Sequence, residues 1–135
     1  MTKTELLTIP RLRASIIARK RLLAKLEEES TCLPNFRGED RVLVSPQNTS
    51  MVICHRIVDL EKEITEDEEK LDRLRGGVQD LLLSADSLCT PERILIRLRY
   101  VDGASWNHVA DFLGYTYRHT LRLHKRILDV IFGSD

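Results

Sequence analysis

One stretch, residues 105–131, constrains the fold of this chain more than any other. It reads SWNHVADFLGYTYRHTLRLHKRILDVI, which is two amphipathic helical patterns separated by a glycine. Ser105 and Thr116 are placed as N-caps, because a hydroxyl at that position accepts a hydrogen bond from the first free N–H groups of a helix. Gly114 stands where a residue in the left-handed conformation ends the first helix. The stretch therefore predicts two helices joined by a tight turn.

The apolar residues of this stretch share one face of each predicted helix. They are Val109, Ala110 and Leu113 in the first helix, and Thr120, Leu123, Ile127 and either Val130 or Ile131 in the second. The small side chain of Ala110, four residues before Gly114, lets the two helices cross closely. This pattern is typical of a helix-turn-helix, whose second helix enters the DNA major groove. A pair of amphipathic helices with a glycine stop and no DNA partner is the alternative.

The outward face of the second helix is expected to suit phosphates and base edges. The candidate DNA-binding residues are Thr116, Tyr117, Arg118, His119, Leu121, Arg122 and Lys125. Among them Arg118 and Arg122 are expected to reach bases, and Lys125 to meet only phosphate. The preceding residues, 91–101, predict a third helix behind the motif. Its expected apolar face is Ile94, Leu95, Leu98 and Val101.

These residues resemble region 4 of sigma-70-type transcription factors, and more closely the short sigma-region-4-like regulators of phages and mobile elements of Gram-positive bacteria. The resemblance is carried by Glu92, Arg93, Leu98, Arg99, Tyr100, Gly103, Ser105, Trp106, Ala110, Leu113, Gly114, Tyr115, Arg118, Arg122 and His124, and more weakly by Asp40, Arg41, Val42 and Ser45. It implies a winged-helix-like transcriptional regulator that binds double-stranded promoter DNA and touches host RNA polymerase. Asn107, His108, Thr120 and Leu121 depart from the family pattern, which affects the base preference more than the fold.

The first half of the chain predicts a helical hairpin, so the whole chain is expected to be all-α. Residues 1–89 form the hairpin domain, with a long loop at 30–50, and residues 90–135 form the helix-turn-helix domain. Pro10 suits the first turn of the first helix. A heptad seam marks the second helix at Ile53, Ile57, Leu60, Ile64, Leu71, Leu74, Val78 and Leu81. Gly76-Gly77 predicts a kink or break in this second helix.

Two charged residues interrupt the apolar seams of this hairpin. Arg19 stands in the first seam and Asp67 in the second, and they are predicted to face each other, because an unpaired charge in a seam is costly. Apolar surface that the short first helix leaves uncovered also favours a homodimer through the N-terminal helices. The neighbouring carboxylates at 66–69 are interpreted as a solvated helix face.

The composition of the chain limits which classes of function it can have. The 21 Lys and Arg residues equal the 21 Asp and Glu residues in number, so a positive electrostatic field that attracts DNA must come from a local cluster of cations.

Cys32, Cys54 and Cys89 are not spaced as metal ligands or disulfide partners, which fits a protein of the cytoplasm. Cys54 and Cys89 are expected to be small apolar residues that fill the core. No apolar run is long enough to span a membrane. No nucleophile motif, nucleotide fingerprint, cofactor or metal site is recognised, so an enzyme is not expected.

The histidines do not form a metal pair. His119 and His124 are five residues apart, a spacing that does not place them on one helix face. His124 is expected to touch phosphate or the edge of the core, and Trp106 is expected to anchor the core. His55 and His108 are interpreted as surface or capping residues.

Two rival functions remain open. The first keeps DNA as the ligand and makes the protein a phage DNA-packaging or terminase-associated binder. The second is a protein-interaction module whose coiled coil is the active part and whose helix-turn-helix has degenerated. Apolar Leu121 and the near-neutral charge of residues 91–135, seven Lys or Arg against five Asp or Glu, favour this second rival weakly.

Overall fold

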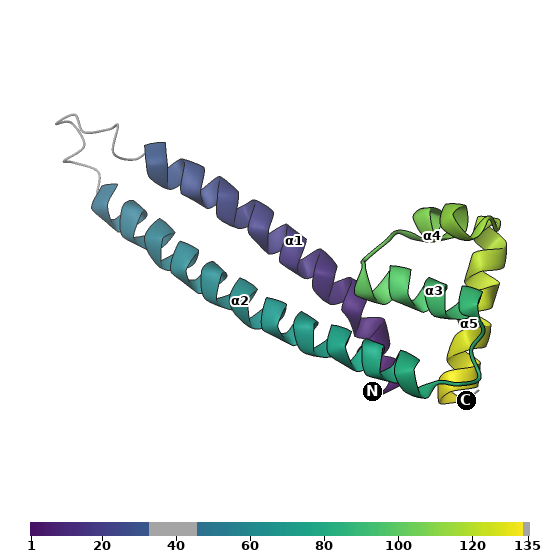
Figure 1. Ribbon diagram of the computed structural model, residues 1–135. Coiled ribbons are helices and arrows are strands. Elements are labelled where there is room, and N and C mark those ends of the chain that lie inside the picture. Colours follow the sequence, from purple (N-terminus) through teal and green to yellow (C-terminus); the bar gives the residue numbers. More distant parts are fainter. Residues whose placement is uncertain (33–45, 134–135) are drawn as a thin grey trace. The chain divides into compact units, whose positions relative to one another are not determined.

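The computed structural model describes residues 1–32 and 46–133, and every regular element among them is helical. The predicted all-α fold is therefore confirmed. The elements are α1 (Lys3–Cys32), α2 (Pro46–Ser84), α3 (Thr90–Ile96), the π-helical turn η3 (Arg97–Val101), α4 (Trp106–Leu113) and α5 (Tyr117–Phe132) (Figure 1). A loop was predicted at 30–50, but residues 30–32 and 46–50 at its two ends are helical. Residues 33–45 lie outside the described residues.

The chain forms two compact units. One is Ala14–Glu69, and the other combines Met1–Arg13 with Lys70–Asp135. The sequence-based division at 89/90 differs from this, because the first residues of α1 and the last part of α2 belong to the same unit as α3, α4 and α5. The helix-turn-helix core is thus built from two separated stretches of sequence.

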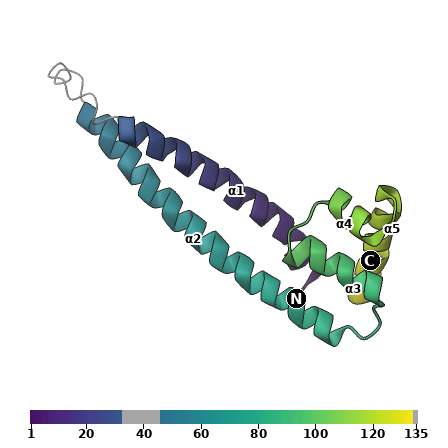
Figure 2. The same cartoon turned by 45° about the horizontal axis from the view of Figure 1, so that its top comes forward.

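Within Ala14–Glu69, α1 and α2 lie side by side and antiparallel (Figures 1 and 2). Ile16, Leu26, Leu60 and Ile64 are all buried there, as the two apolar stripes require. The heptad residues Ile53 and Ile57 are half-buried. The seam predicted from the 3.5-residue repeat is therefore the covered face of α2 in this unit.

The two charged seam residues meet, as predicted. Arg19 donates a hydrogen bond from Nη1 to Oδ2 of Asp67, and its Nε lies 3.5 Å from Oε2 of Glu63. Lys20 Nζ is 2.9 Å from Oε2 of Glu68. The interpretation of residues 66–69 as a solvated face is confirmed for Glu66, Glu68 and Glu69, which are exposed. It is wrong for Asp67, which is half-buried against Arg19 of α1.

Helix α1 begins earlier than Pro10, which corrects the predicted start. Thr2 and Glu5 cap it reciprocally: Thr2 N–H donates to Oε2 of Glu5 at 2.9 Å, and Glu5 N–H donates to Oγ1 of Thr2 at 3.2 Å. Pro10 then lies inside the helix. The added turns are stabilised because Leu6 and Ile9 are fully buried.

Helix α2 runs through Gly76-Gly77 without interruption, so the predicted break is wrong. A Cβ added to Gly77 would lie 3.2 Å from Cε of Met1. Absence of a side chain there leaves room for the chain's first residue. Packing of the neighbouring Val78, which is fully buried, supports helix in spite of the low helix propensity of glycine.

One hydrophobic core holds the unit that contains the helix-turn-helix. Its buried members are Leu6, Ile9, Val78, Leu88, Leu95, Ile96, Tyr100, Val101, Val109, Leu123, Ile127 and Leu128. They come from every helix of this unit. The expectation that Cys54 and Cys89 fill apolar space is wrong, since both are exposed. Within the described residues no helix combines the length and apolar character needed to cross a bilayer.

Candidate nucleic-acid interface

Helix α4 has the start and the stop that the sequence predicts. Oγ of Ser105 accepts a hydrogen bond from His108 N–H at 3.2 Å, and Val109 and Ala110 face the core. Gly114 has φ +74°, the left-handed conformation that glycine adopts without a Cβ clash. The next N–H, of Tyr115, then donates to the carbonyl of Ala110 at 3.0 Å. The chain therefore leaves α4 in one tight turn.

Helix α5 starts two residues after this turn. Oγ1 of Thr116 accepts a hydrogen bond from His119 N–H at 3.1 Å, which is the predicted N-cap. The inward face of α5 consists of Thr120, Leu123, Ile127 and Leu128. Thr120 fits this apolar face although it is polar, because its hydroxyl donates to the carbonyl of Thr116 at 2.9 Å.

The predicted third helix packs against α4 and α5, and two residues of its expected inward face, Leu95 and Val101, are buried. Pro91 stands in its first turn, as predicted. The π-helical turn at Arg97–Val101 adds one residue to the helical period. Tyr100 therefore turns into the core beside Val101, while the expected core residues Ile94 and Leu98 are only half-buried.

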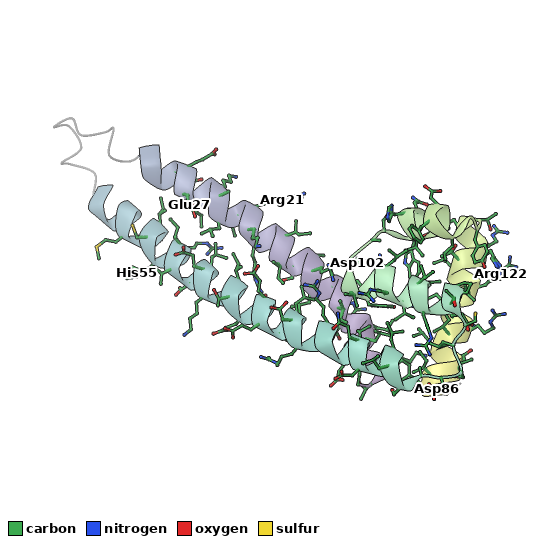
Figure 3. The ribbon with its side chains drawn as sticks, viewed as in Figure 1. Arg21, Glu27, His55, Asp86, Asp102 and Arg122 are labelled. Atoms are coloured by element: carbon green, nitrogen blue, oxygen red, sulfur yellow. The ribbon has the colours of Figure 1, made fainter. Side chains whose placement is uncertain are left out.

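The outward face of α5 carries the predicted DNA-binding residues. Thr116, Tyr117, Arg118, His119, Arg122 and Lys125 are exposed, and Leu121 is half-buried. Figure 3 shows Arg122 pointing away from α3. The side chains of Arg118, Arg122 and Lys125 have no hydrogen-bond or ion-pair partner among the described residues. Three cations on one face of α5 are therefore open to an external anion.

Two other basic residues of this unit, Arg93 and Arg126, have protein partners. Arg93 donates to the backbone carbonyls of Leu82, Ala85 and Leu88, so it closes the end of α2 onto α3. Nη2 of Arg126 lies 3.7 Å from Oε2 of Glu92.

Arg126 and the N–H of Cys89 both contact the Glu92 carboxylate and favour its charged form. Its carboxylate also accepts a hydrogen bond from Cys89 N–H at 2.9 Å. This bond and the Arg126 charge hold the pKa of Glu92 below its usual value.

His124 is half-buried at the edge of the core, which is one of the two places expected for it. Its Nε2 lies 2.6 Å from the hydroxyl of Tyr100, and its ring packs edge-on against Trp106 with centroids 4.6 Å apart. Burial lowers the pKa of His124 to about 4, and it raises the pKa of Tyr100 to about 12. Both groups are thus neutral at pH 7, and the phenol hydroxyl can donate to an unprotonated Nε2.

Trp106 is the predicted core anchor, and it also holds a cation. It packs against the core while Arg99 lies over its ring, 4.5 Å from the centroid. Nη1 of Arg99 donates to the carbonyl of Ala104 at 3.1 Å. Arg99 thereby fixes the loop that leads into α4.

Arg13 is a residue that sequence reasoning missed. Its Nη2 donates to the carbonyls of Tyr100 at 3.0 Å and Val101 at 2.6 Å, which lie at the end of η3. A Cβ on Gly103, whose φ is +76°, would clash with the guanidinium of Arg13. Burial, together with the charge of Arg75, lowers the pKa of Arg13. The only sequence signal was the glycine, whose conformation and close contact both exclude a side chain.

The geometry is therefore that of a helix-turn-helix with an exposed basic face on its second helix. No cluster of three His, Cys, Asp or Glu side chains that could bind a metal occurs within residues 1–32 and 46–133. His55 and His108 are exposed, as expected. Comparison of the chain with protein-family models, with curated proteins and with solved structures finds no match.

Proposed function

We propose that the protein binds double-stranded DNA in a sequence-specific way through α4, the Gly114 turn and α5, and that it regulates transcription. One observation carries this proposal: Arg118, Arg122 and Lys125 are exposed, and they have no partner among the described residues, on a helix whose opposite face is buried in the core. A rigid helix with unpaired cations suits the major groove, where the phosphate backbone attracts the cations and base edges are accessible.

The first turns of α5 are the part that reads bases. Arg118 and Arg122 are four residues apart and share one side of the helix. Arginine can donate two hydrogen bonds to O6 and N7 of guanine, and the half-buried Leu121 offers a contact for a thymine methyl group. Lys125 lies one turn farther along and contacts phosphate only.

The regulatory role rests on the resemblance to sigma region 4. On this basis we infer that the protein acts at promoters in the cytoplasm of a bacterial host, as a phage or mobile-element regulator that touches host RNA polymerase. Because DNA sites for helix-turn-helix proteins are commonly read by pairs of subunits, a homodimer through the N-terminal helices would present two α5 helices to two half-sites. Sedimentation that gives a monomer at tens of micromolar, about the range of weak pairing, would contradict the dimer.

The test is DNA binding by the full chain at several salt concentrations. After the preferred site is selected from random duplexes, Arg118→Ala or Arg122→Ala should cost about 1–3 kcal/mol on that site and relax the preference at one position. Lys125→Ala should weaken binding to all duplexes about equally and lower the salt slope by about one. Genome-wide mapping of bound DNA in the host distinguishes promoters from packaging sites.

Arg21→Ala is the matched control, because Arg21 is an exposed arginine on α1 in the Ala14–Glu69 unit (Figure 3). It should leave affinity unchanged. If the double variant of Arg118 and Arg122 binds DNA with wild-type affinity and salt dependence, the DNA-binding role is wrong. The protein-interaction function would then explain the exposed α5 face better.

A further inference from the structure

A groove lies between the last turns of α2 and the helix that follows it, within the unit that contains the helix-turn-helix. Its volume is about 500 Å³. Leu82, Leu83 and Ile94 supply its apolar lining, and Gln79 and Thr90 supply uncharged polar groups. A space of this size falls in the range of sites that bind ligands or the anchoring side chains of a peptide.

The apolar lining is open to solvent. Leu83 is 80 % exposed, more than any other large apolar side chain in the described part of the chain. Leu82 and Ile94 beside it are half-buried. A single exposed leucine is ordinary, but three aliphatic side chains along one concave surface form a place where a partner can bury apolar area.

The charged residues of the groove are both cations. Arg93 and Arg97 line it, and no carboxylate of residues 1–32 or 46–133 does. The Arg93 guanidinium is held by three backbone carbonyls, whereas the side chain of Arg97 is exposed and has no hydrogen-bond or ion-pair partner among the described residues. The groove therefore combines an apolar surface with an uncompensated positive charge at η3.

We propose that this groove binds an acidic amphipathic segment of a partner protein. Two or three aliphatic or aromatic side chains of that segment pack on Leu82, Leu83 and Ile94, and a carboxylate of the segment pairs with Arg97. Bidentate pairing of a guanidinium with a carboxylate fixes the register, and the apolar contacts supply most of the affinity. This proposal does not depend on DNA binding by α5.

The experiment uses the full chain and a display library of random 16-residue peptides. Parallel selections are made on the wild type and on the Leu83→Ser/Arg97→Glu double variant. The wild type should enrich peptides that carry Asp or Glu beside apolar residues at helical spacing, and the double variant should not. Both substitutions are at exposed positions, so circular dichroism and thermal melting should be unchanged.

Affinities of an enriched peptide then test the two contacts separately. Fluorescence anisotropy should show binding weakened about tenfold or more by Arg97→Glu and by Leu83→Ser. A version of the peptide with Lys in place of its acidic residue should bind Arg97→Glu better than it binds the wild type. Arg56→Glu and Val58→Ser, both at exposed positions of α2 in the Ala14–Glu69 unit, are the matched controls and should leave affinity unchanged.

Three results would overturn the proposal. The first is that no peptide is enriched on the wild type relative to the double variant. The second is that enriched peptides lack acidic residues or bind the Arg97→Glu variant as tightly as the wild type. The third is that Arg97→Glu and Leu83→Ser weaken DNA binding while no peptide depends on them, which would make the groove part of a nucleic-acid contact.

Discussion

Arg19 of α1 donates a hydrogen bond to the carboxylate of Asp67 of α2, at positions that apolar residues hold elsewhere in the two facing seams. The side chain of Arg19 is 36 % exposed and that of Asp67 is 21 % exposed, so the pair is partly shielded from water. One charged residue in each stripe, meeting in register, excludes sliding of the two helices by a turn, because a slipped alignment would place both charges against apolar side chains.

The Arg19–Asp67 pair should matter more for the alignment of α1 with α2 than for the stability of the folded chain. Arg19→Ala should lower the free energy of unfolding by about 1–2 kcal/mol, since it leaves the partly buried Asp67 carboxylate without its cation. Asp67→Ala should cost less, because Arg19 keeps Glu63 as an ion-pair partner. The joint replacement Arg19→Leu/Asp67→Leu should be close to neutral. Urea denaturation of the single and double variants measures this. The more exposed Lys20–Glu68 pair is the control, and a coupling energy as large as that of Arg19–Asp67 would contradict the shielding argument.

Gly103 should tolerate substitution less well than Gly114, although both have positive φ. At Gly114 an added Cβ meets nothing within 4 Å, so Gly114→Ala should cost about 1 kcal/mol of left-handed strain. At Gly103 the Cβ meets the Arg13 guanidinium, and Gly103→Ala should cost about 2–4 kcal/mol. Chemical denaturation gives both values. Gly103→Ala should be less damaging in an Arg13→Ala background, and equal costs in the two backgrounds would exclude a steric origin.

Residues 90–135 should not form a stable domain alone. Leu6 and Ile9 of α1 and Val78 of α2 are fully buried in the core that α3, α4 and α5 share, so a fragment that lacks them exposes one side of that core. Circular dichroism and proton NMR of this fragment should show no cooperative unfolding. In the full chain, Leu6→Ala and Ile9→Ala should each cost about 2–5 kcal/mol. Leu7→Ala is the control, since Leu7 is 41 % exposed and its loss should be nearly silent.

Stability should fall as the pH falls from 6.5 to 4. His124 has an ordinary pKa of 6.5 when the chain is unfolded and a pKa of about 4 when its ring is buried, with Arg99 and Lys3 adding unfavourable charge. Between these values the unfolded state binds more protons, so acid favours unfolding. The loss should be on the order of 2 kcal/mol after partial exposure is discounted.

His124→Gln tests this origin, because glutamine can accept the Tyr100 hydroxyl and does not titrate. Thermal melting of the wild type and of this variant at pH 4 to 7 measures the difference. The variant should lose less stability than the wild type across this interval, and identical pH profiles would assign the acid sensitivity to other groups.

The local signals of the sequence determined the helix-turn-helix. Ser105 and Thr116 cap helices, and Gly114 ends one, through bonds that span at most five positions, so neighbouring residues are sufficient to predict them. The face of α5 that carries Arg118 and Arg122 followed from its helical period. The meeting of Arg19 with Asp67 was also predictable, because the charged interruptions of two regular seams have one favourable alignment.

Tertiary packing alone decided the rest. Pro10 lies inside α1, and Gly76-Gly77 lies inside an unbroken α2, because burial of the flanking apolar residues outweighs a local helix-breaking tendency. The position of His124 depends on an added residue in η3 that turns Tyr100 inward. Arg13 reaches carbonyls 87 and 88 residues away, and a contact of that separation leaves no periodic trace in the sequence. The unit that contains α5 is therefore completed by the first residues of α1 and the last part of α2. These segments come together with α5 only once the helices have packed.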